Sequence, residues 1–126
     1  MVYRLKRNNE FRIVYRRGRS IANNVLVLYV FKNKNNKDKN SLYYNKVGIS
    51  VSKKVGNSVI RSRCKRLITE SYRIKTDKLK TGYDFIFVAR TNIKGKDYHQ
   101  VDRAVESLLK KAGLYNDNEK NTNKNN

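Results

Sequence analysis

The sequence predicts a single α/β domain, because stretches with helical periodicity alternate along the chain with stretches that are typical of β-strands. Three stretches repeat apolar side chains every three or four positions, as helices with one buried face do: residues 8–17, 57–73 and 97–112. Three others are short and rich in β-branched and aromatic residues: residues 23–32, 43–52 and 82–90. The length of 126 residues suits one domain, which we place at residues 1–115.

The first helix has polar residues at its start and a glycine at its end. Asn8 and Asn9 are its candidate N-caps, and Glu10 is favourable in its first turn. Apolar side chains then follow at helical spacing: Phe11, Val14 and Tyr15. Gly18 supplies a C-terminal stop.

The two strands that follow differ in their alternation. Residues 23–32 are apolar at consecutive positions, which predicts that both faces of this strand are at least partly covered. In residues 43–52, Val47, Ile49 and Val51 share one face. A polar loop of low complexity, residues 33–41, joins the two strands. We therefore predict that they pair as a hairpin.

The second helix is amphipathic, and its polar face is almost purely cationic. Asn57 and Ser58 are its candidate N-caps. One side carries small or apolar residues at helical spacing: Ile60, Cys64, Leu67, Ile68 and Ser71. The other side carries cations: Arg61, Lys65, Arg66 and Arg73, with Arg63 at the far edge.

The last strand opens at Gly82 and is predicted to be buried. The last helix runs from Asp97 to Ala112, and Gly113 ends it. Its inner face is formed by residues at helical spacing: Tyr98, Val101, Val105, Leu108 and Ala112. Residues 116–126 are rich in Asn and Lys, and we predict that this tail is disordered.

The net charge of +20, from 30 Lys and Arg against 10 Asp and Glu, points to a polyanionic partner. No acidic residue lies between Lys39 and Thr69, so the basic helix lacks the i,i+4 ion pairs of an ordinary solvated helix. Like charges at this spacing, such as Arg61 and Lys65, destabilise an isolated helix. Arginine also binds phosphate bidentately and stacks on bases. The helix therefore predicts contact with a nucleic acid.

Few residues suited to catalysis are present. We place the one His, His99, on an exposed side of the last helix, and the one Cys, Cys64, in the core. No Cys/His set has metal-ligand spacing, and no glycine-rich phosphate loop occurs. No apolar run approaches the roughly 18 residues of a membrane span. We expect a cytoplasmic protein with no membrane partner, no small-molecule substrate and no protein-held metal.

Aromatic side chains are a second indication of RNA binding. Phe11, Tyr15 and Tyr29 lie in the most basic part of the chain. Exposed rings on a sheet beside a basic groove suit single-stranded RNA, whose bases stack on such rings. Periodicity alone leaves base stacking and core packing open for these three residues.

Residues 52–70, SKKVGNSVIRSRCKRLITE, resemble the signature of the bacterial ribonuclease P protein subunit. The matching residues are Lys53, Lys54, Gly56, Asn57, Arg61, Arg63, Lys65 and Arg66. The N-terminal stretch RLKRNNEFRIVYRRGRSIANNVLVLYV and the later YDFIFVAR also resemble that family, so the likeness covers residues 3–115. One departure is Ser62, which stands where the family carries Asn and keeps a hydroxyl donor and acceptor but lacks the second polar group of the amide.

The resemblance implies an α/β sandwich with a central four-stranded sheet, in the order helix, three strands, helix, strand, helix. It also implies a left-handed strand–helix–strand crossover, against the usual right-handed rule. Residues 19–21 are the candidate for the strand that periodicity does not reveal.

The resemblance also implies a function. Ribonuclease P removes the 5′ leader from precursor tRNA, and its RNA subunit is the catalyst, with Mg²⁺ bound mainly by RNA. The protein would bind the catalytic RNA through one set of residues: Lys53, Lys54, Asn57, Arg61, Ser62, Arg63, Lys65 and Arg66. It would bind the single-stranded leader in a cleft between helix and sheet through another set: Phe11, Tyr15, Tyr29 and Arg90. No catalytic residue is expected in the protein.

Three other classes share some of these features. A non-catalytic RNA-binding module, such as a ribosomal protein, would carry the same charge. A DNA reader would want an Asn or Gln on its recognition helix and usually a dimer face, and neither is evident. A peripheral membrane protein would need an apolar face rich in Trp and Phe opposite the cations.

Overall fold

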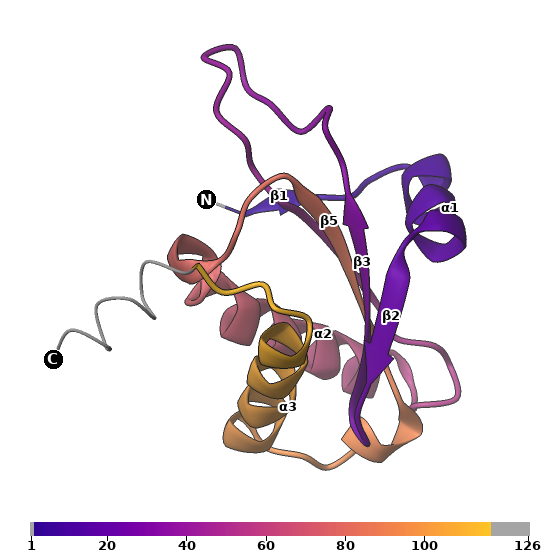
Figure 1. Cartoon of the computed structure of the whole chain (residues 1–126). Coiled ribbons are helices and arrows are strands. Elements are labelled where there is room, and N and C mark those ends of the chain that lie inside the picture. Colours follow the sequence, from indigo (N-terminus) through magenta and orange to yellow (C-terminus); the bar gives the residue numbers. More distant parts are fainter. Residues whose placement is uncertain (1, 117–126) are drawn as a thin grey trace, which may run out of the picture.

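A mixed sheet with helices packed on both of its faces makes up the computed structural model, which describes residues 2–116 (Figure 1). The strands are β1 (Tyr3–Arg4), β2 (Arg19–Ala22), β3 (Leu26–Lys32), β4 (Lys46–Ser50) and β5 (Tyr83–Ala89). The helices are α1 (Asn8–Arg17), α2 (Ser58–Arg73) and α3 (Tyr98–Lys111). Two short 3₁₀-helices, η1 (Thr76–Lys78) and η2 (Thr91–Ile93), follow α2 and β5. The predicted α/β class and the positions of the three helices are confirmed.

The strand order is β1-β4-β5-β3-β2, and it shows that the predicted hairpin is wrong. The strand β5 lies between β3 and β4, antiparallel to the first and parallel to the second. The alternation of apolar and polar residues shows which face of a strand is buried, but it does not show which other strand pairs with it. The helix α2 joins β4 to its parallel neighbour β5, as a crossover must. The left-handed sense of that crossover stays a prediction.

The sheet has five strands, one more than the resemblance implies. The strand β2 confirms the short strand expected at residues 19–21. The additional strand is β1, which pairs in parallel with β4 through Tyr3 opposite Lys46 and Arg4 opposite Val47. Two residues are too few to leave a periodic signal in the sequence. The strand β4 is also shorter than the predicted residues 43–52.

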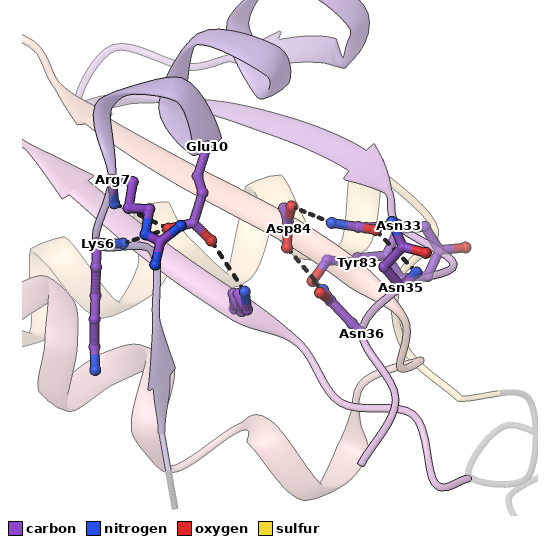
Figure 2. Close-up of polar contacts among 9 residues, drawn as sticks. Lys6, Arg7, Glu10, Asn33, Asn35, Asn36, Tyr83 and Asp84 are labelled. Atoms are coloured by element: carbon purple, nitrogen blue, oxygen red, sulfur yellow. Dashed lines mark hydrogen bonds and ion pairs between the residues drawn. The ribbon is translucent and has the colours of Figure 1, made fainter. Parts of the chain in front are cut away.

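Arg7, and not Asn8 or Asn9, is the N-cap of α1. The Glu10 carboxylate takes over the capping, since its Oε1 accepts hydrogen bonds from the backbone N–H groups of Arg7, at 2.9 Å, and Lys6, at 3.0 Å (Figure 2). Glu10 is therefore favourable in the first turn, as predicted, and its reach backwards moves the start of the helix. The C-cap at Gly18 agrees with the sequence.

The two faces of the sheet carry separate apolar clusters. Leu28 and Val30 of β3 face α2 and α3, together with Phe85 and Phe87 of β5. The alternate residues of the same strands, including Ile86, face α1. The expectation that residues 23–32 are covered on both faces is confirmed, with the second face only partly buried at Tyr29 and Phe31.

The C-terminal part agrees with its prediction over most of its length. Asp97 and Ala112 are the N-cap and C-cap of α3. Asn116, placed in the tail by composition, donates hydrogen bonds from its backbone N–H to Lys78 O, at 2.9 Å, and from its side chain to Leu79 O, at 3.3 Å. The rest of the tail predicted to be disordered, residues 117–126, lies outside the described residues.

Candidate nucleic-acid interface

The helix α2 is built as its pattern predicts. The Asn57 side chain accepts a hydrogen bond from the backbone N–H of Ile60 at 3.0 Å, which identifies Asn57 as the N-cap. Cys64, Ile68, Ser71 and Tyr72 are buried against the rest of the domain. These contacts hold the opposite side of the helix toward solvent.

The predicted RNA-binding residues of this region form one surface, which we call the basic surface: Lys53, Lys54, Asn57, Arg61, Ser62, Arg63, Lys65 and Arg66. All of them are exposed except Arg61, which is half-buried. Within residues 2–116 none of its cations forms an ion pair. The positive charge is therefore available to an external anion.

Two arginines of the basic surface differ in their surroundings. The Arg63 guanidinium donates a hydrogen bond to Lys96 O at 3.0 Å, which ties α2 to the segment before α3. The Nε of Arg61 is buried and has no hydrogen-bond partner in the described part of the chain. A buried donor without a partner costs about 1–3 kcal/mol.

Lys53 and Lys54 lie in the turn between β4 and α2, next to the N-cap. Arg90 follows β5 at the same end of the sheet, because β4 and β5 are parallel and Ser50 lies opposite Val88. Its guanidinium donates to Asn23 O at 3.1 Å. The predicted leader residue Arg90 is thus at the end of the sheet from which the basic surface begins.

The rings of Phe11, Tyr15 and Tyr29, which we call the aromatic surface, come together on the α1 side of the sheet. Phe11 and Tyr29 are half-buried around the small cluster of Leu5, Val14 and Ile86. The rings of Tyr15 and Tyr29 make an edge-to-face contact, with their centroids 4.9 Å apart. Tyr15 remains 41% exposed. Core packing and exposure therefore coexist in this group.

The Tyr15 hydroxyl stays protonated at neutral pH. Partial burial raises the pKa of Tyr15, and the neighbouring Tyr29 raises it further, against a lowering by the Ser50 hydroxyl. A protonated phenol can donate a hydrogen bond as well as offer its ring.

Two features of the aromatic surface were missed from sequence. A Cβ on Gly48 would lie 2.5 Å from Phe11 Cε1, so the glycine lets the ring sit on β4. The signal was a glycine inside an otherwise apolar strand, which marks close approach. The second is the Lys46–Glu10 ion pair, 3.0 Å between Nζ and Oε2, which fastens α1 to β4.

The Glu10 carboxylate is held ionised by these contacts. Partial burial alone would raise its pKa, but hydrogen bonds from the backbone of Arg7 and Lys6, with the Lys46 ammonium, lower the pKa to about 2. The same pair raises the pKa of Lys46. Both charges therefore persist over the whole neutral range.

The remaining polar candidates have no arrangement for catalysis. His99 is exposed and Cys64 is buried, as predicted, and burial raises the pKa of the Cys64 thiol. Across residues 2–116, no three His, Cys, Asp or Glu side chains gather as metal ligands would. In the same part of the chain, no helix has the length and apolar character needed to cross a membrane.

Comparison with known proteins places this arrangement in a family. A family model described as Ribonuclease P matches residues 2–113. The chain is 62% identical over 119 residues to the ribonuclease P protein component of Clostridium beijerinckii, covering 94% of this chain and 95% of that protein. The corresponding protein of Clostridium perfringens is 60% identical over 120 residues, 95% of each chain.

Solved structures show the same likeness in three dimensions. The structure of the Staphylococcus aureus RNase P protein superposes with a TM-score of 0.77 at 33% identity, covering 92% of this chain and 100% of that one. The RNase P protein from Thermotoga maritima gives a TM-score of 0.73 at 25% identity, covering 86% and 96%. The arrangement of strands and helices described above is thus shared with these proteins.

Proposed function

The chain belongs to the ribonuclease P protein family and is a subunit of that tRNA-processing ribonuclease, and we propose that it binds the enzyme's catalytic RNA and the single-stranded 5′ leader of precursor tRNA. The observation that carries the proposal is the basic surface, whose cations have no anionic partner among residues 2–116. The alternative of a ribosomal protein, which charge alone leaves open, has no support from the family match.

The catalytic RNA is the proposed partner of the basic surface. An RNA that folds compactly brings phosphates close together, and the cations on α2 would neutralise some of them. Arginine is suited to this contact because its planar guanidinium binds phosphate oxygens in pairs. Ser62 stands within this surface and can still donate and accept one hydrogen bond.

The leader is the proposed partner of the aromatic surface. Phe11, Tyr15 and Tyr29 present rings on which unpaired bases can stack. Arg90 is exposed at the end of the sheet nearest the basic surface, where a phosphate of the same strand would meet it. The two surfaces thus support one protein that holds the catalyst and its substrate together.

Catalysis is assigned to the RNA subunit with Mg²⁺ bound mainly by RNA. The described residues do not fit a Mg²⁺ site of their own, because no cluster of acidic ligands forms among them. The protein would contribute by neutralising phosphates, which lowers the Mg²⁺ that the RNA needs to fold. A cytoplasmic location stays a prediction.

Cleavage of precursor tRNA by a bacterial ribonuclease P RNA at low Mg²⁺, with and without this protein, tests the proposal. Wild-type protein should stimulate cleavage, and so should Arg103→Ala, which removes an exposed arginine of α3 outside the basic surface. The pair Arg61→Ala and Arg66→Ala should lose most of the stimulation. No stimulation by the wild type would contradict the proposed function.

The salt dependence of binding to the catalytic RNA tests the phosphate contacts separately. The logarithm of the affinity should fall steeply with the logarithm of salt concentration, by roughly one unit for each phosphate contact. Removing Arg61 and Arg66 together should reduce the slope by about two, whereas Arg103→Ala should leave it unchanged. Equal slopes for all three proteins would show that these arginines do not meet phosphates.

A further inference from the structure

Three tyrosines outside both proposed surfaces gather at the end of the sheet where β4 begins. We call Tyr3, Tyr43 and Tyr44 the tyrosine platform. The rings of Tyr3 and Tyr44 pack against each other in a tilted arrangement, with centroids 4.4 Å apart and planes inclined by 31°. Tyr3 is 40% exposed and Tyr43 is 45% exposed. All three line a hollow of about 170 Å³.

A buried polar anchor holds the loop that carries Tyr43 and Tyr44. Asp84 is buried within the apolar strand β5, and its carboxylate accepts hydrogen bonds from the side chains of Asn36, at 2.7 Å, and Asn33, at 2.9 Å (Figure 2). The backbone N–H of Tyr44 in turn donates to Asn36 O at 3.0 Å. The loop between β3 and β4, which projects from the end of the sheet, is therefore fastened where the tyrosines lie (Figure 1).

The ring of Tyr43 has a defined seat and a cation above it. Gly82 adopts a φ of +92°, and a Cβ there would lie 3.4 Å from the Tyr43 ring, so the ring rests against the glycine backbone. The Lys37 ammonium lies 5.1 Å from the centroid of the same ring. Such a pair leaves a cation next to an exposed aromatic surface, as in proteins that stack nucleic-acid bases.

Positive charge surrounds the platform on the side of α1. Tyr3 also borders a second hollow, of about 650 Å³, whose lining includes Arg4, Lys6, Arg7 and Lys46. Its acidic residue, Glu10, is already paired with Lys46. On the other side, Asp77 lines the smaller hollow. The net field at Tyr3 therefore favours an anion, and the rings favour a flat apolar group.

We propose that the tyrosine platform is a second binding site for single-stranded RNA, with bases stacked on Tyr3 and Tyr43 and phosphates held by Arg4 and Lys37. The platform and Arg90 lie at opposite ends of β5, which is about 20 Å long. It is therefore separate from the end of the sheet at which Lys53, Lys54 and Arg90 lie. Rings that only packed in the core would be buried. The basic residues around the platform would repel another basic protein, which disfavours such a protein as the occupant. The inference goes beyond the proposed function.

Photocrosslinking to a short oligouridylate that carries 4-thiouridine tests the site directly. Trypsin cuts after Lys39 and Lys46, so one peptide, residues 40–46, holds both Tyr43 and Tyr44. Another, residues 20–32, holds Tyr29 and reports the aromatic surface in the same digest. We expect RNA-tagged peptide 40–46, and we expect it to persist in Tyr29→Ala. Tagging of peptide 20–32 without peptide 40–46 would overturn the proposal.

Binding of the same oligouridylate to full-length variants tests the stacking. Tyr3→Ala with Tyr43→Ala should weaken binding about tenfold, because base–aromatic stacking contributes on that scale. The matched pair Tyr3→Phe with Tyr43→Phe keeps both rings and should bind within about twofold of the wild type. Wild-type affinity for the alanine pair would overturn the proposal. An equal loss in the phenylalanine pair would also overturn it, since the rings would then not be the contact.

The source of the strand is found with the assembled ribonuclease P. 4-Thiouridine is placed in turn in the leader of precursor tRNA and in single-stranded segments of the catalytic RNA. Tagging of peptide 40–46 from either RNA supports the site and identifies its occupant. If free oligouridylate tags the peptide but neither RNA does in the assembly, the platform is not an RNA site in the enzyme. The free oligouridylate arm needs no catalytic RNA, so its failure is distinct from failure of the cleavage assay.

Discussion

Both faces of the sheet contain edge-to-face aromatic contacts, but the rings are buried on one face and partly exposed on the other. On the face covered by α2 and α3, Tyr72 meets Phe85 and Phe87 edge to face and is 2% exposed. On the face covered by α1, Tyr15 meets Tyr29 edge to face and is 41% exposed. Burial raises the pKa of both tyrosines, and that of Tyr72 far more strongly.

The difference teaches how much of each face is committed to the fold. The face under α2 and α3 has two helices of 16 and 14 residues packed on it, whereas the face under α1 has one helix of 10. A short helix cannot cover a five-stranded sheet, so rings that pack on one edge remain open on the other. The rings on the α1 side can thus stabilise the domain and still meet a ligand.

Phe87→Ala should produce the largest effect on stability. Phe87 is fully buried on the face under α2 and α3, and deleting such a ring typically costs about 3–5 kcal/mol of unfolding free energy. Phe11→Ala on the other face should cost less than half as much, because Phe11 is half-buried. Urea unfolding followed by circular dichroism measures both. Equal losses would show that the α1 side is a full core, and the comparison between the faces would fail.

Gly48→Ala should disturb the α1 side with an intermediate effect. The added methyl would lie 2.5 Å from the Phe11 ring, so the ring must move off β4. We expect a loss of about 1–3 kcal/mol in unfolding free energy, together with weaker binding of long-leader substrate. Gly95→Ala is a useful control for the methyl itself, because it meets nothing within 4 Å, although its φ of +82° adds strain. If the stability of Gly48→Ala is unchanged, the Phe11 ring can pack in another position without loss of free energy.

Tyr29→Ala should separate the two proposed RNA contacts. Loss of its ring should weaken binding of precursor tRNA with a long leader about tenfold, and assembly with the catalytic RNA much less. Tyr29→Phe keeps the ring and should behave as the wild type in both measurements. Filter binding with long-leader and leaderless substrates resolves the two. Equal losses in both would mean that the leader site is misassigned.

Glu10→Gln should have the smallest effect, and it depends on pH. The pKa of Glu10 is lowered from 4.5 to about 2 on folding, so its carboxylate stabilises the fold above pH 4.5, and this contribution disappears as the pH falls toward 2. Because the group is partly exposed, we expect less than about 1 kcal/mol. The unfolding free energy of the wild type should fall over this interval more than that of Glu10→Gln. If the unfolding free energies of both proteins change with pH in the same way, the Glu10 carboxylate does not help to hold α1 on the sheet.

The elements that the sequence predicts well are those decided by neighbours along the chain. Asn57 caps α2 because its side chain reaches an N–H three residues ahead, and Asp97 caps α3 in the same way. The exposure of the basic surface was likewise predictable, since unpaired charges stay in water. The cap of α1 was mispredicted because a third residue, Glu10, supplies the acceptor.

The elements that were mispredicted depend on contacts between distant segments. The strand β5 displaces β3 from β4 although more than 30 residues separate Tyr83 from Ser50. The seat of Phe11 on Gly48 and the anchor of Asn36 on Asp84 depend on that same pairing. Gly48 and Asp84 are recognisable in the sequence as a glycine and an aspartate inside apolar strands, but the neighbouring residues do not indicate which distant side chains they contact.

By itself the sequence determined the charge, the helices, the faces of the strands and the cations on α2, because these follow from local periodicity and from the cost of burying charge. Only the tertiary structure decided the strand order and the gathering of aromatic rings at two separate places on the domain. Strand pairing joins backbone groups that every residue but proline shares, so the choice of neighbour is made by the packing of the whole sheet.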